Sequence, residues 1–311
     1  MASLPTCVLL GTPAFAIPTA DMLVRTPCVT FLGVITKPDE PVGRTQEHTP
    51  PPLKRWAATR GCSVWQPETK AVLTSLLQEL HPDCMIVVAY GKIILSEALA
   101  VPRWGAINLH PSLLPKYRGP SPVHAAIAHG DQETGVTVML LDAEIDHGPL
   151  LAQERVPIPD GVSRTVLEEL LAERGAALLE RILPEYFSGH IVPHEQNHAD
   201  ATFTSLLVRA DGKLDWSQPA HVLARLVRAY EGWPGTWCLL PDGRRLKVLG
   251  AHTGDSEKGS PGMLAASADD RIAVICGDQQ TLVLTEVQPE GRGAMTGPEF
   301  RRGQPKLMQL M

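Results

Sequence analysis

The sequence predicts an α/β domain with a doubly wound, mostly parallel sheet, followed by a small C-terminal β-barrel. Residues 7–11 and 29–36 are apolar, strand-forming runs, and the stretch between them has the composition of a helix that reaches about residue 25. A strand, a helix and a strand in this order predict parallel pairing with a right-handed crossover. Beyond residue 245, short apolar runs alternate with Gly, Asp and Pro turns, which is typical of a small barrel.

Length and composition agree with an ordinary globular protein of two domains. The chain has 311 residues, of which 44% are hydrophobic and 20% charged. It lacks both an apolar run of about 20 residues, which a bilayer crossing requires, and a basic-then-apolar N-terminal signal. The six cysteines stand singly, which favours a reducing compartment over a zinc or redox motif. We therefore expect a cytoplasmic protein, a monomer, with no membrane contact and no metal.

The net charge of −6 argues against indiscriminate nucleic-acid binding. The excess of acidic residues lies before residue 206, whereas residues 206–311 are close to neutral. This distribution permits a localised basic surface on the C-terminal domain.

The first domain is expected to continue with further helices and strands as far as residue 188. A near-continuous apolar run such as Cys84–Ala89 is typical of a strand buried on both faces of a parallel sheet. A dinucleotide site in the first turn is disfavoured, because only Gly11 stands where three glycines are needed and Pro13 removes an amide. The remaining predicted elements are helices at 53–59, 71–80, 122–129 and 163–187, and strands at 135–141 and 150–156.

The stretch Asn108–Gly119 carries the residues that suit carbonyl chemistry. Asn108 and His110 alternate at the end of a short apolar run, so both side chains leave the strand on one face. An amide can donate to a developing oxyanion, and an imidazole can move protons near neutral pH. From these residues alone, the plainer alternative is a capped strand end followed by a Pro-rich turn.

The longer string Asn-Leu-His-Pro-Ser-Leu-Leu-Pro-Lys-Tyr-Arg-Gly at 108–119 resembles the signature of the folate-dependent formyltransferases. The resemblance implies an α/β catalytic domain that uses 10-formyl-tetrahydrofolate as co-substrate. It implies that Asn108 donates to the oxyanion and that His110 relays a proton. The loop that it assigns to the folate site consists of Ser112, Leu113, Leu114 and Pro115.

Two further segments gain a role from this resemblance. Tyr90 and Gly91 follow a buried strand at the sheet edge where ligands bind in open α/β sheets, and the resemblance places their backbone against the pterin ring. Taken alone, this segment reads equally well as a Gly turn. The acidic loop 142–149 would ordinarily be a solvated loop. The resemblance brings Asp146 to His110, where it would orient the imidazole and favour its charged form, and it places Asp142 at the folate site.

The segment from Lys37 to Pro52 is predicted to be an irregular surface loop. It is either a plain connector or, by resemblance, the insertion with which tRNA-acting members of the family engage the acceptor end of initiator tRNA, with Arg44 as its arginine. The residues after Arg44 are Thr-Gln-Glu-His rather than a basic run. Fewer phosphates would then be neutralised, and the salt dependence would be shallower.

The predicted domains are 1–188 and 206–311, joined by a linker at 189–205. His190, His194 and His198 have helical spacing, but Gly189 and Pro193 break such a helix, so a metal site is not expected.

An amphipathic helix at 219–229 opens the second domain, with strands expected at 246–249, 262–264, 272–275 and 282–287. The Trp-Pro-x-x-Trp string at 233–237 resembles the entry into the family's OB-like C-terminal barrel. On this barrel Arg244, Arg245 and Lys247 could contact tRNA phosphates, although solvated turn charges are an equally ordinary explanation.

The reaction implied is transfer of a formyl group to the α-amine of initiator methionyl-tRNA. Two alternatives stay open. One is a formyltransferase for a small amine such as a nucleotide amino sugar, and the other is a non-catalytic tRNA- or folate-binding protein.

Overall fold

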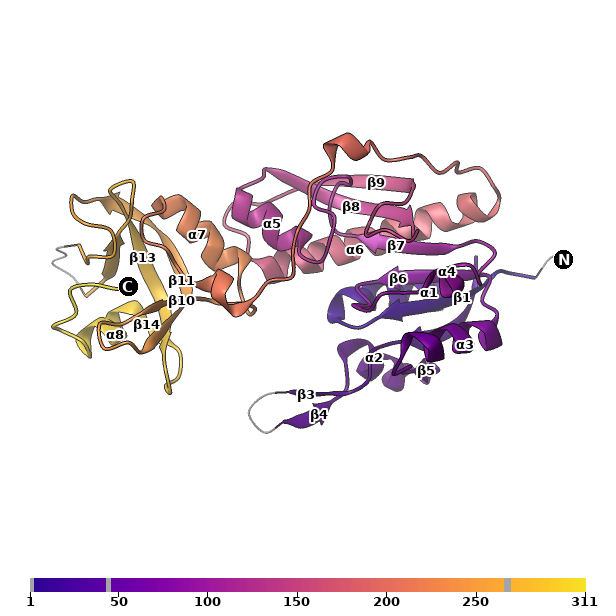
Figure 1. The fold of residues 1–311 in the computed structure, drawn as a ribbon, viewed down its shortest axis with the longest axis horizontal. Coiled ribbons are helices and arrows are strands. Elements are labelled where there is room, and N and C mark those ends of the chain that lie inside the picture. Colours follow the sequence, from indigo (N-terminus) through magenta and orange to yellow (C-terminus); the bar gives the residue numbers. More distant parts are fainter. Residues whose placement is uncertain (1–2, 43–45, 266–269) are drawn as a thin grey trace. The chain divides into compact units, whose positions relative to one another are not determined.

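The computed structural model describes residues 3–42, 46–265 and 270–311. The chain divides into two compact units (Figure 1). The first consists of Met1–Pro122, Glu133–Pro157 and Glu168–Thr204, and the second of Val123–Gln132, Ile158–Leu167 and Ser205–Met311. The second unit thus includes two short stretches from within the predicted first domain. The domain boundaries at residues 188 and 206 stay a prediction.

A seven-stranded sheet forms the first unit, in the order β5-β2-β1-β6-β7-β8-β9. The pairs from β5 to β7 are parallel, which confirms the predicted mostly parallel sheet, and β8 and β9 are added antiparallel. β6 and β7 are buried along their whole length, as strands covered on both faces must be. The strands are β1 (Thr6–Gly11), β2 (Thr30–Ile35), β5 (Val64–Trp65), β6 (Cys84–Val88), β7 (Ala106–His110), β8 (Glu133–Leu140) and β9 (Leu150–Pro157).

The helices before residue 188 follow the predicted pattern closely. Gly61 ends α2 with a φ of +64°, a left-handed conformation that glycine adopts without strain. The side chain of Thr69 caps α3 by accepting the Val72 amide at 3.2 Å. These helices are η1 (Ala14–Ala16), α1 (Ile17–Arg25), α2 (Pro52–Arg60), α3 (Lys70–Leu80), α4 (Ser96–Leu99), α5 (Pro122–His129) and α6 (Arg164–Phe187).

The segment predicted as an irregular loop after Lys37 contains a two-stranded hairpin, so that prediction was wrong. β3 (Glu40–Val42) and β4 (Glu47–Thr49) pair antiparallel. Asp39, at the base of the hairpin, accepts hydrogen bonds from Lys54 and Gln66, each at 2.8 Å. These bonds lower the pKa of the Asp39 carboxyl, the bond from Lys54 most strongly. Arg44 lies outside the described residues.

The second unit contains an antiparallel sheet in the order β10-β11-β13-β12, with β14 paired to β13. The amphipathic helix α7 (Ala220–Ala229) buries Leu223 and Val227 in one hydrophobic core with Val248 and Leu284 from the sheet. The other elements are η3 (Arg209–Gly212), β10 (Thr236–Leu239), β11 (Arg245–Ser256), β12 (Ile272–Ile275), β13 (Gln280–Pro289), β14 (Met295–Thr296) and α8 (Gly297–Arg302).

Two details of this sheet differ from the prediction. The strand expected at 262–264 is absent from the described residues, because Met263 and Leu264 form only isolated bridges, to Gln309 and Val274. β11 extends well beyond the predicted 246–249, through polar residues up to Ser256 that pair with β13 despite several register shifts. Within the described ranges, no helix combines the length and the apolar character that crossing a membrane demands.

Candidate active site

Asn108 and His110 lie at the carboxyl end of β7, in the interior of the sheet. β7 pairs with β6 on one side and β8 on the other, with Asn108 opposite Val87 and Met139. The two side chains are largely buried, at 8% and 5% exposure. The strand's alternation therefore brings an amide and an imidazole to one protected position.

The imidazole of His110 contacts one group through each ring nitrogen. Nε2 lies 2.9 Å from the carbonyl oxygen of Tyr117, and because a carbonyl only accepts, Nε2 donates this bond. Nδ1 lies 3.6 Å from Oδ2 of Asp146. The nitrogen that is free to exchange a proton is thus Nδ1, which faces a carboxylate, and the predicted approach of Asp146 to His110 is present in the structure.

Both residues that contact this imidazole have a left-handed backbone. The φ angles are +61° at Tyr117 and +48° at Asp146. Few non-glycine residues occupy this region, and those that do persist where neighbouring contacts hold them. Asp146 is held in part by the Gly119 amide, which donates to its Oδ2 at 2.7 Å.

The side chain of Asn108 has no hydrogen-bond partner among the described residues. Buried amides normally satisfy their donors, so an amide left free at a strand end is available to a bound molecule. This is the arrangement that an oxyanion donor requires.

The loop predicted to line the folate site is braced from the neighbouring strands. Ser112 is fully buried; its hydroxyl donates to the Lys116 carbonyl at 2.5 Å, and its carbonyl accepts from Thr137 at 2.6 Å. Leu114, also buried, donates its amide to the same Thr137 hydroxyl and accepts from Gln153. The Ser112 hydroxyl and the Leu114 backbone are therefore hydrogen-bonded within the protein, and the Leu114 side chain is buried, while Leu113 and Pro115 are half-buried.

Thr137 and Gln153 were missed by the sequence analysis. Each is a polar residue in an otherwise ordinary strand, β8 or β9, and only the antiparallel pairing of these strands places both beneath the loop.

At the end of β6, the backbone of Tyr90–Gly91 and the Tyr90 side chain have different surroundings. The Tyr90 ring is buried in a core cluster with Val8 and Met85, and burial raises the pKa of its phenol to about 12. Gly91 is exposed, with a φ of +74°. The backbone at Gly91 is therefore exposed, whereas the phenol of Tyr90 belongs to the core.

Asp142 braces its own loop. Its Oδ2 accepts a hydrogen bond from Nδ1 of His147 at 2.6 Å, and its Oδ1 accepts the Glu144 amide at 2.9 Å. The carboxylate is nevertheless partly exposed, at 36% of its side chain.

The predicted tRNA contacts of the second unit differ in how far their charge is compensated. Arg244 pairs with Asp242, which raises the pKa of the guanidinium. Arg245 lies over the Trp237 ring at 4.6 Å. Arg245 and Lys247 alternate with buried Leu246 along β11 and are both exposed, so they share one face of the strand.

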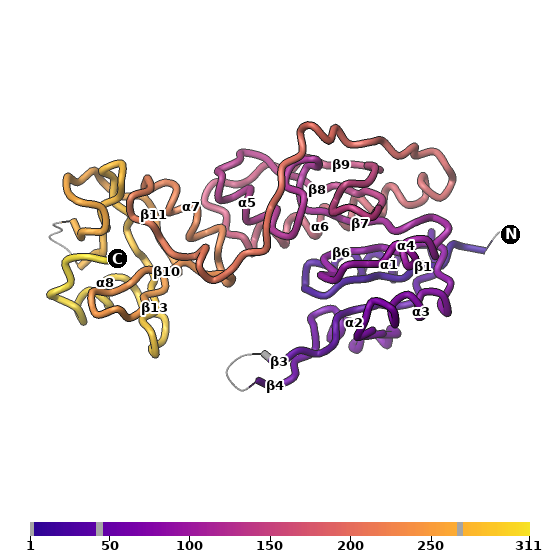
Figure 2. The backbone as a smooth tube through the Cα atoms, in the orientation of Figure 1, coloured from indigo at the N-terminus to yellow at the C-terminus, as the bar shows by residue number. Residues whose placement is uncertain are grey.

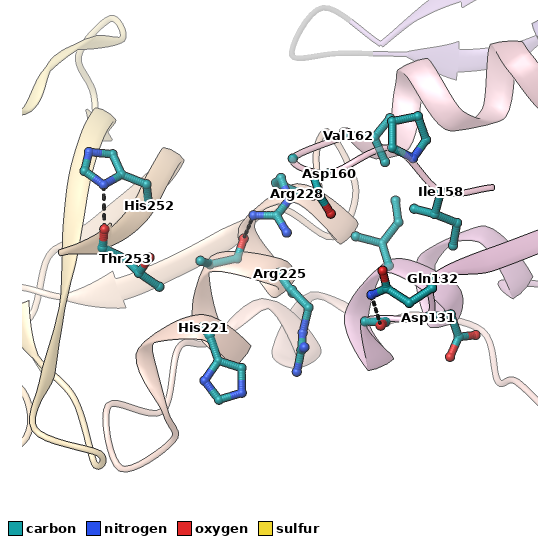
Figure 3. Close-up of a pocket in the computed structure, with 15 residues that line it drawn as sticks. Asp131, Gln132, Ile158, Asp160, Val162, His221, Arg225, Arg228, His252 and Thr253 are labelled. Atoms are coloured by element: carbon teal, nitrogen blue, oxygen red, sulfur yellow. Dashed lines mark hydrogen bonds between the residues drawn. The ribbon is translucent and has the colours of Figure 1, made fainter.

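A separate cavity of about 340 Å³ lies within the second unit (Figure 3). Arg225 and Arg228 of α7 line it, together with Asp160, His221 and His252. The pKa of Arg228 is lowered, first by burial and then by Arg225. None of the predicted site residues lines this cavity, and a pair of guanidinium groups suits an anion rather than acyl chemistry.

Comparison with known proteins identifies the family. The model of the formyl transferase family matches residues 9–183, and that of the formyl transferase C-terminal domain matches residues 207–305. The methionyl-tRNA formyltransferase of Roseiflexus castenholzii is 43% identical over 303 residues, which cover 95% of each chain. That of Myxococcus xanthus is 39% identical over 304 residues, or 97% of this chain and 96% of the relative.

Solved structures share the fold at low identity. Aquifex aeolicus HypX in complex with tetrahydrofolic acid has a TM-score of 0.63 and 16% identity, over 96% of this chain and 47% of that one. A 4-N formyltransferase from Francisella tularensis has a TM-score of 0.64 and 14% identity, over 79% and 97% of the two chains. On the sequence matches, the chain belongs to the formyl transferase family, among relatives that are methionyl-tRNA formyltransferases.

Proposed function

We propose that this protein transfers the formyl group of 10-formyl-tetrahydrofolate to the α-amine of initiator methionyl-tRNA, in support of translation initiation. The observation that carries the proposal is the pairing of His110 with Asp146 beside the free amide of Asn108. The identity of 37–43% with methionyl-tRNA formyltransferases over nearly the whole chain supports the same acceptor.

In this reaction the folate supplies the formyl carbon and the protein supplies charge stabilisation and proton transfer. Asn108 donates to the oxygen on which negative charge develops, and losing such a donor costs about 3 kcal/mol of transition-state stabilisation. His110 takes the proton of the attacking amine at Nδ1 and returns one to the departing nitrogen, typically an effect of about 10²–10⁴-fold. Asp146 orients the imidazole and stabilises its charged form.

The folate would contact the open backbone at Gly91 and the edge of the loop formed by Leu113 and Pro115, with Asp142 beside it. The exposure and positive φ of Gly91 support this assignment, because a ligand can approach a backbone without a side chain closely. Ser112, Leu114 and Tyr90 act indirectly, by fixing the shape of the loop and of the turn.

For the tRNA, Arg245 and Lys247 supply phosphate contacts on a C-terminal sheet that we infer to be an OB-like barrel. The antiparallel order of the sheet and the register shifts along the long strand β11, which let it bend, support this shape. Arg244 and Arg44 are further candidates from the sequence. The protein would act as a monomer in the cytoplasm, where its tRNA substrate is used.

The deciding experiment measures transfer of labelled formyl from 10-formyl-tetrahydrofolate to charged initiator tRNA, with elongator methionyl-tRNA and nucleotide amino sugars as controls. We expect label on the initiator methionyl-tRNA. Label on a sugar amine alone would replace this function with the small-amine alternative, and no transfer together with intact tRNA binding would indicate a binding protein.

A further inference from the structure

Residues 194–204, which we call the strap, lie along the active-site loop rather than forming a free linker. After α6 the chain turns back toward β9 (Figure 2), where His194 and Leu150 exchange backbone hydrogen bonds of 2.9 and 2.7 Å. Farther along, the Arg118 amide donates to the Thr202 carbonyl, and the Arg118 carbonyl accepts from Thr204 at 2.7 Å. The strap therefore pairs with the segment that follows the catalytic strand.

Both groups that contact His110 are fixed by the strap. The hydroxyl of Thr202 accepts the amide of Tyr117 at 2.8 Å, and the Tyr117 carbonyl is the partner of His110 Nε2. The side-chain amide of Gln196 donates to the carbonyl oxygens of Asp146 and Gly148 at 2.9 and 2.8 Å. Tyr117 and Asp146, the two left-handed residues of the site, are thus each tied to the strap by a direct hydrogen bond.

A buried arginine connects the strap to the loop from within. Arg118, only 3% exposed, donates to Oε1 of Gln196 through Nε at 3.2 Å and Nη2 at 2.8 Å. Its Nη2 also lies 2.8 Å from Nδ1 of His198. Because a guanidinium can only donate, Nδ1 of His198 accepts this bond and carries no hydrogen. The observed hydrogen bond therefore uses the lone pair of Nδ1 of His198.

The His198 ring is held on its other side by a second histidine. It stacks on His147 with 4.1 Å between ring centroids and an interplanar angle of 2°. His147 donates through Nδ1 to Asp142, a residue of the loop that also carries Asp146. The strap is thus attached to this loop both through Gln196 and through the stacked rings.

We propose that the strap positions His110 and Asp146, and that the Arg118–His198 hydrogen bond is an acid-sensitive latch on it. A proton on Nδ1 of His198 would replace the acceptor with a donor and place a second positive charge against the Arg118 guanidinium. The ionisable groups around this ring are Arg118, His147 with its partner Asp142, and Asp200 in the same turn, whose carboxylate is bonded to Asn197.

Opening the latch would displace His110 and Asp146 from their positions relative to each other. A misplacement of about 1 Å can reduce turnover about 10²-fold. The expected loss of turnover rests on the proposed function, because it concerns formyl transfer. The hydrogen bonds of the strap do not, and they can be tested in the absence of substrate.

The first test is amide hydrogen exchange of the peptide that covers Tyr117, Arg118 and Gly119, whose amide hydrogens end on the strap or on Asp146. Exchange is compared at about pH 8 and about pH 5.5, a range in which histidines titrate, after correction for intrinsic rates. We expect protection to fall on acidification in the wild type and to stay constant in His198→Asn, which keeps an acceptor at the Nδ1 position but cannot take up a proton. An equal fall in both proteins would overturn the latch.

The second test is kinetic. Gln196→Met removes the donor to Asp146 and Gly148 and the acceptor of Arg118, with little change of size. We expect kcat to fall about 10²-fold with a smaller change in KM. At about pH 8, His198→Asn should retain a higher kcat than His198→Ala, and the decline of kcat toward acid pH should be less steep than in the wild type. His190→Asn is the matched control, because His190 is exposed and bonds only Glu185 and Ser188 among described side chains.

A Gln196→Met enzyme with wild-type kcat would remove the positioning role. Failure of the wild type to transfer formyl to methionyl-tRNA would instead count against the proposed function. The exchange result does not depend on that activity.

Discussion

Gly119 donates its amide hydrogen to the Asp146 carboxylate oxygen that also faces Nδ1 of His110. One oxygen atom thus joins the backbone of the Pro-rich loop to the imidazole of His110. Replacing Asp146 with asparagine separates the effect of its charge from that of its position, because asparagine retains the acceptor oxygen but not the negative charge.

We expect Asp146→Asn to fold normally and to lower kcat at least about 10²-fold, since the imidazolium formed during proton transfer loses its counter-charge. Steady-state formylation measures this, with Glu185→Gln, at the exposed end of α6, as the control for loss of a carboxylate. Wild-type turnover in Asp146→Asn would show that the charge has no part in catalysis.

Asn108→Ala tests the oxyanion donor. The side chain has no protein partner to lose among the described residues, so the melting temperature should change little. The transition state, however, loses about 3 kcal/mol, or roughly 10²-fold in kcat. Thermal unfolding and kinetics measured on the same preparation separate these effects. A large loss of stability with unchanged kcat would reverse this assignment.

Thr137→Val tests the brace beneath the loop. The valine leaves the Ser112 carbonyl and the Leu114 amide without their partner in a fully buried site. We expect a loss of about 1–3 kcal/mol in the free energy of unfolding, measured with denaturant. Thr30→Val, at an exposed position of β2, should change this free energy by less than about 0.5 kcal/mol. Equal effects of the two substitutions would contradict the brace.

Acid stability should depend on Asp83. The Thr6 backbone amide lowers the pKa of its carboxyl, and the Thr6 hydroxyl and Arg103 also contribute. A carboxyl whose pKa is lowered by folding contributes stability above its unfolded pKa of about 4 and loses it as the pH falls through the folded value. The stability difference between wild type and Asp83→Asn should therefore shrink from pH 7 toward about pH 3, as followed by unfolding midpoints. A constant difference would exclude this contribution.

The basic face of β11 predicts a graded effect on tRNA affinity. Lys247→Ala should weaken binding and reduce the slope of log K against log salt by about 1, because one phosphate contact is lost. Arg244→Ala should have less effect, since Asp242 already compensates its charge. Titrations with methionyl-tRNA at several salt concentrations distinguish the two. A larger slope change for Arg244→Ala would contradict this ranking.

The sheet and most helices of the catalytic half could be predicted from local patterns. Runs such as Cys84–Val88 are apolar throughout, as is typical of a strand covered on both faces, and Gly61 marks a helix end by its backbone preference. The signature around His110 gave the chemistry, and the third member, Asp146, came from resemblance, because nothing local indicates that it approaches His110.

The parts that were missed depend on pairing between distant segments. The hairpin of β3 and β4 consists of polar, loop-like residues, and the last residues of β11 are strand only because β13 supplies their partners. The strap has the composition of a linker, since Gln196, Thr202 and Thr204 bond to residues far away in the sequence. Nothing in the local sequence shows that these polar side chains bond to distant residues rather than to water.

β9 is the last strand of the seven-stranded sheet, so its outer side offers unpaired backbone groups to any other extended chain. The reciprocal bonds between Leu150 and His194 occupy the beginning of this side, and Glu154 and Arg155 bring charge to its second half. The strap thereby also covers the start of this edge, which leaves fewer unpaired backbone groups for strand addition by another protein molecule.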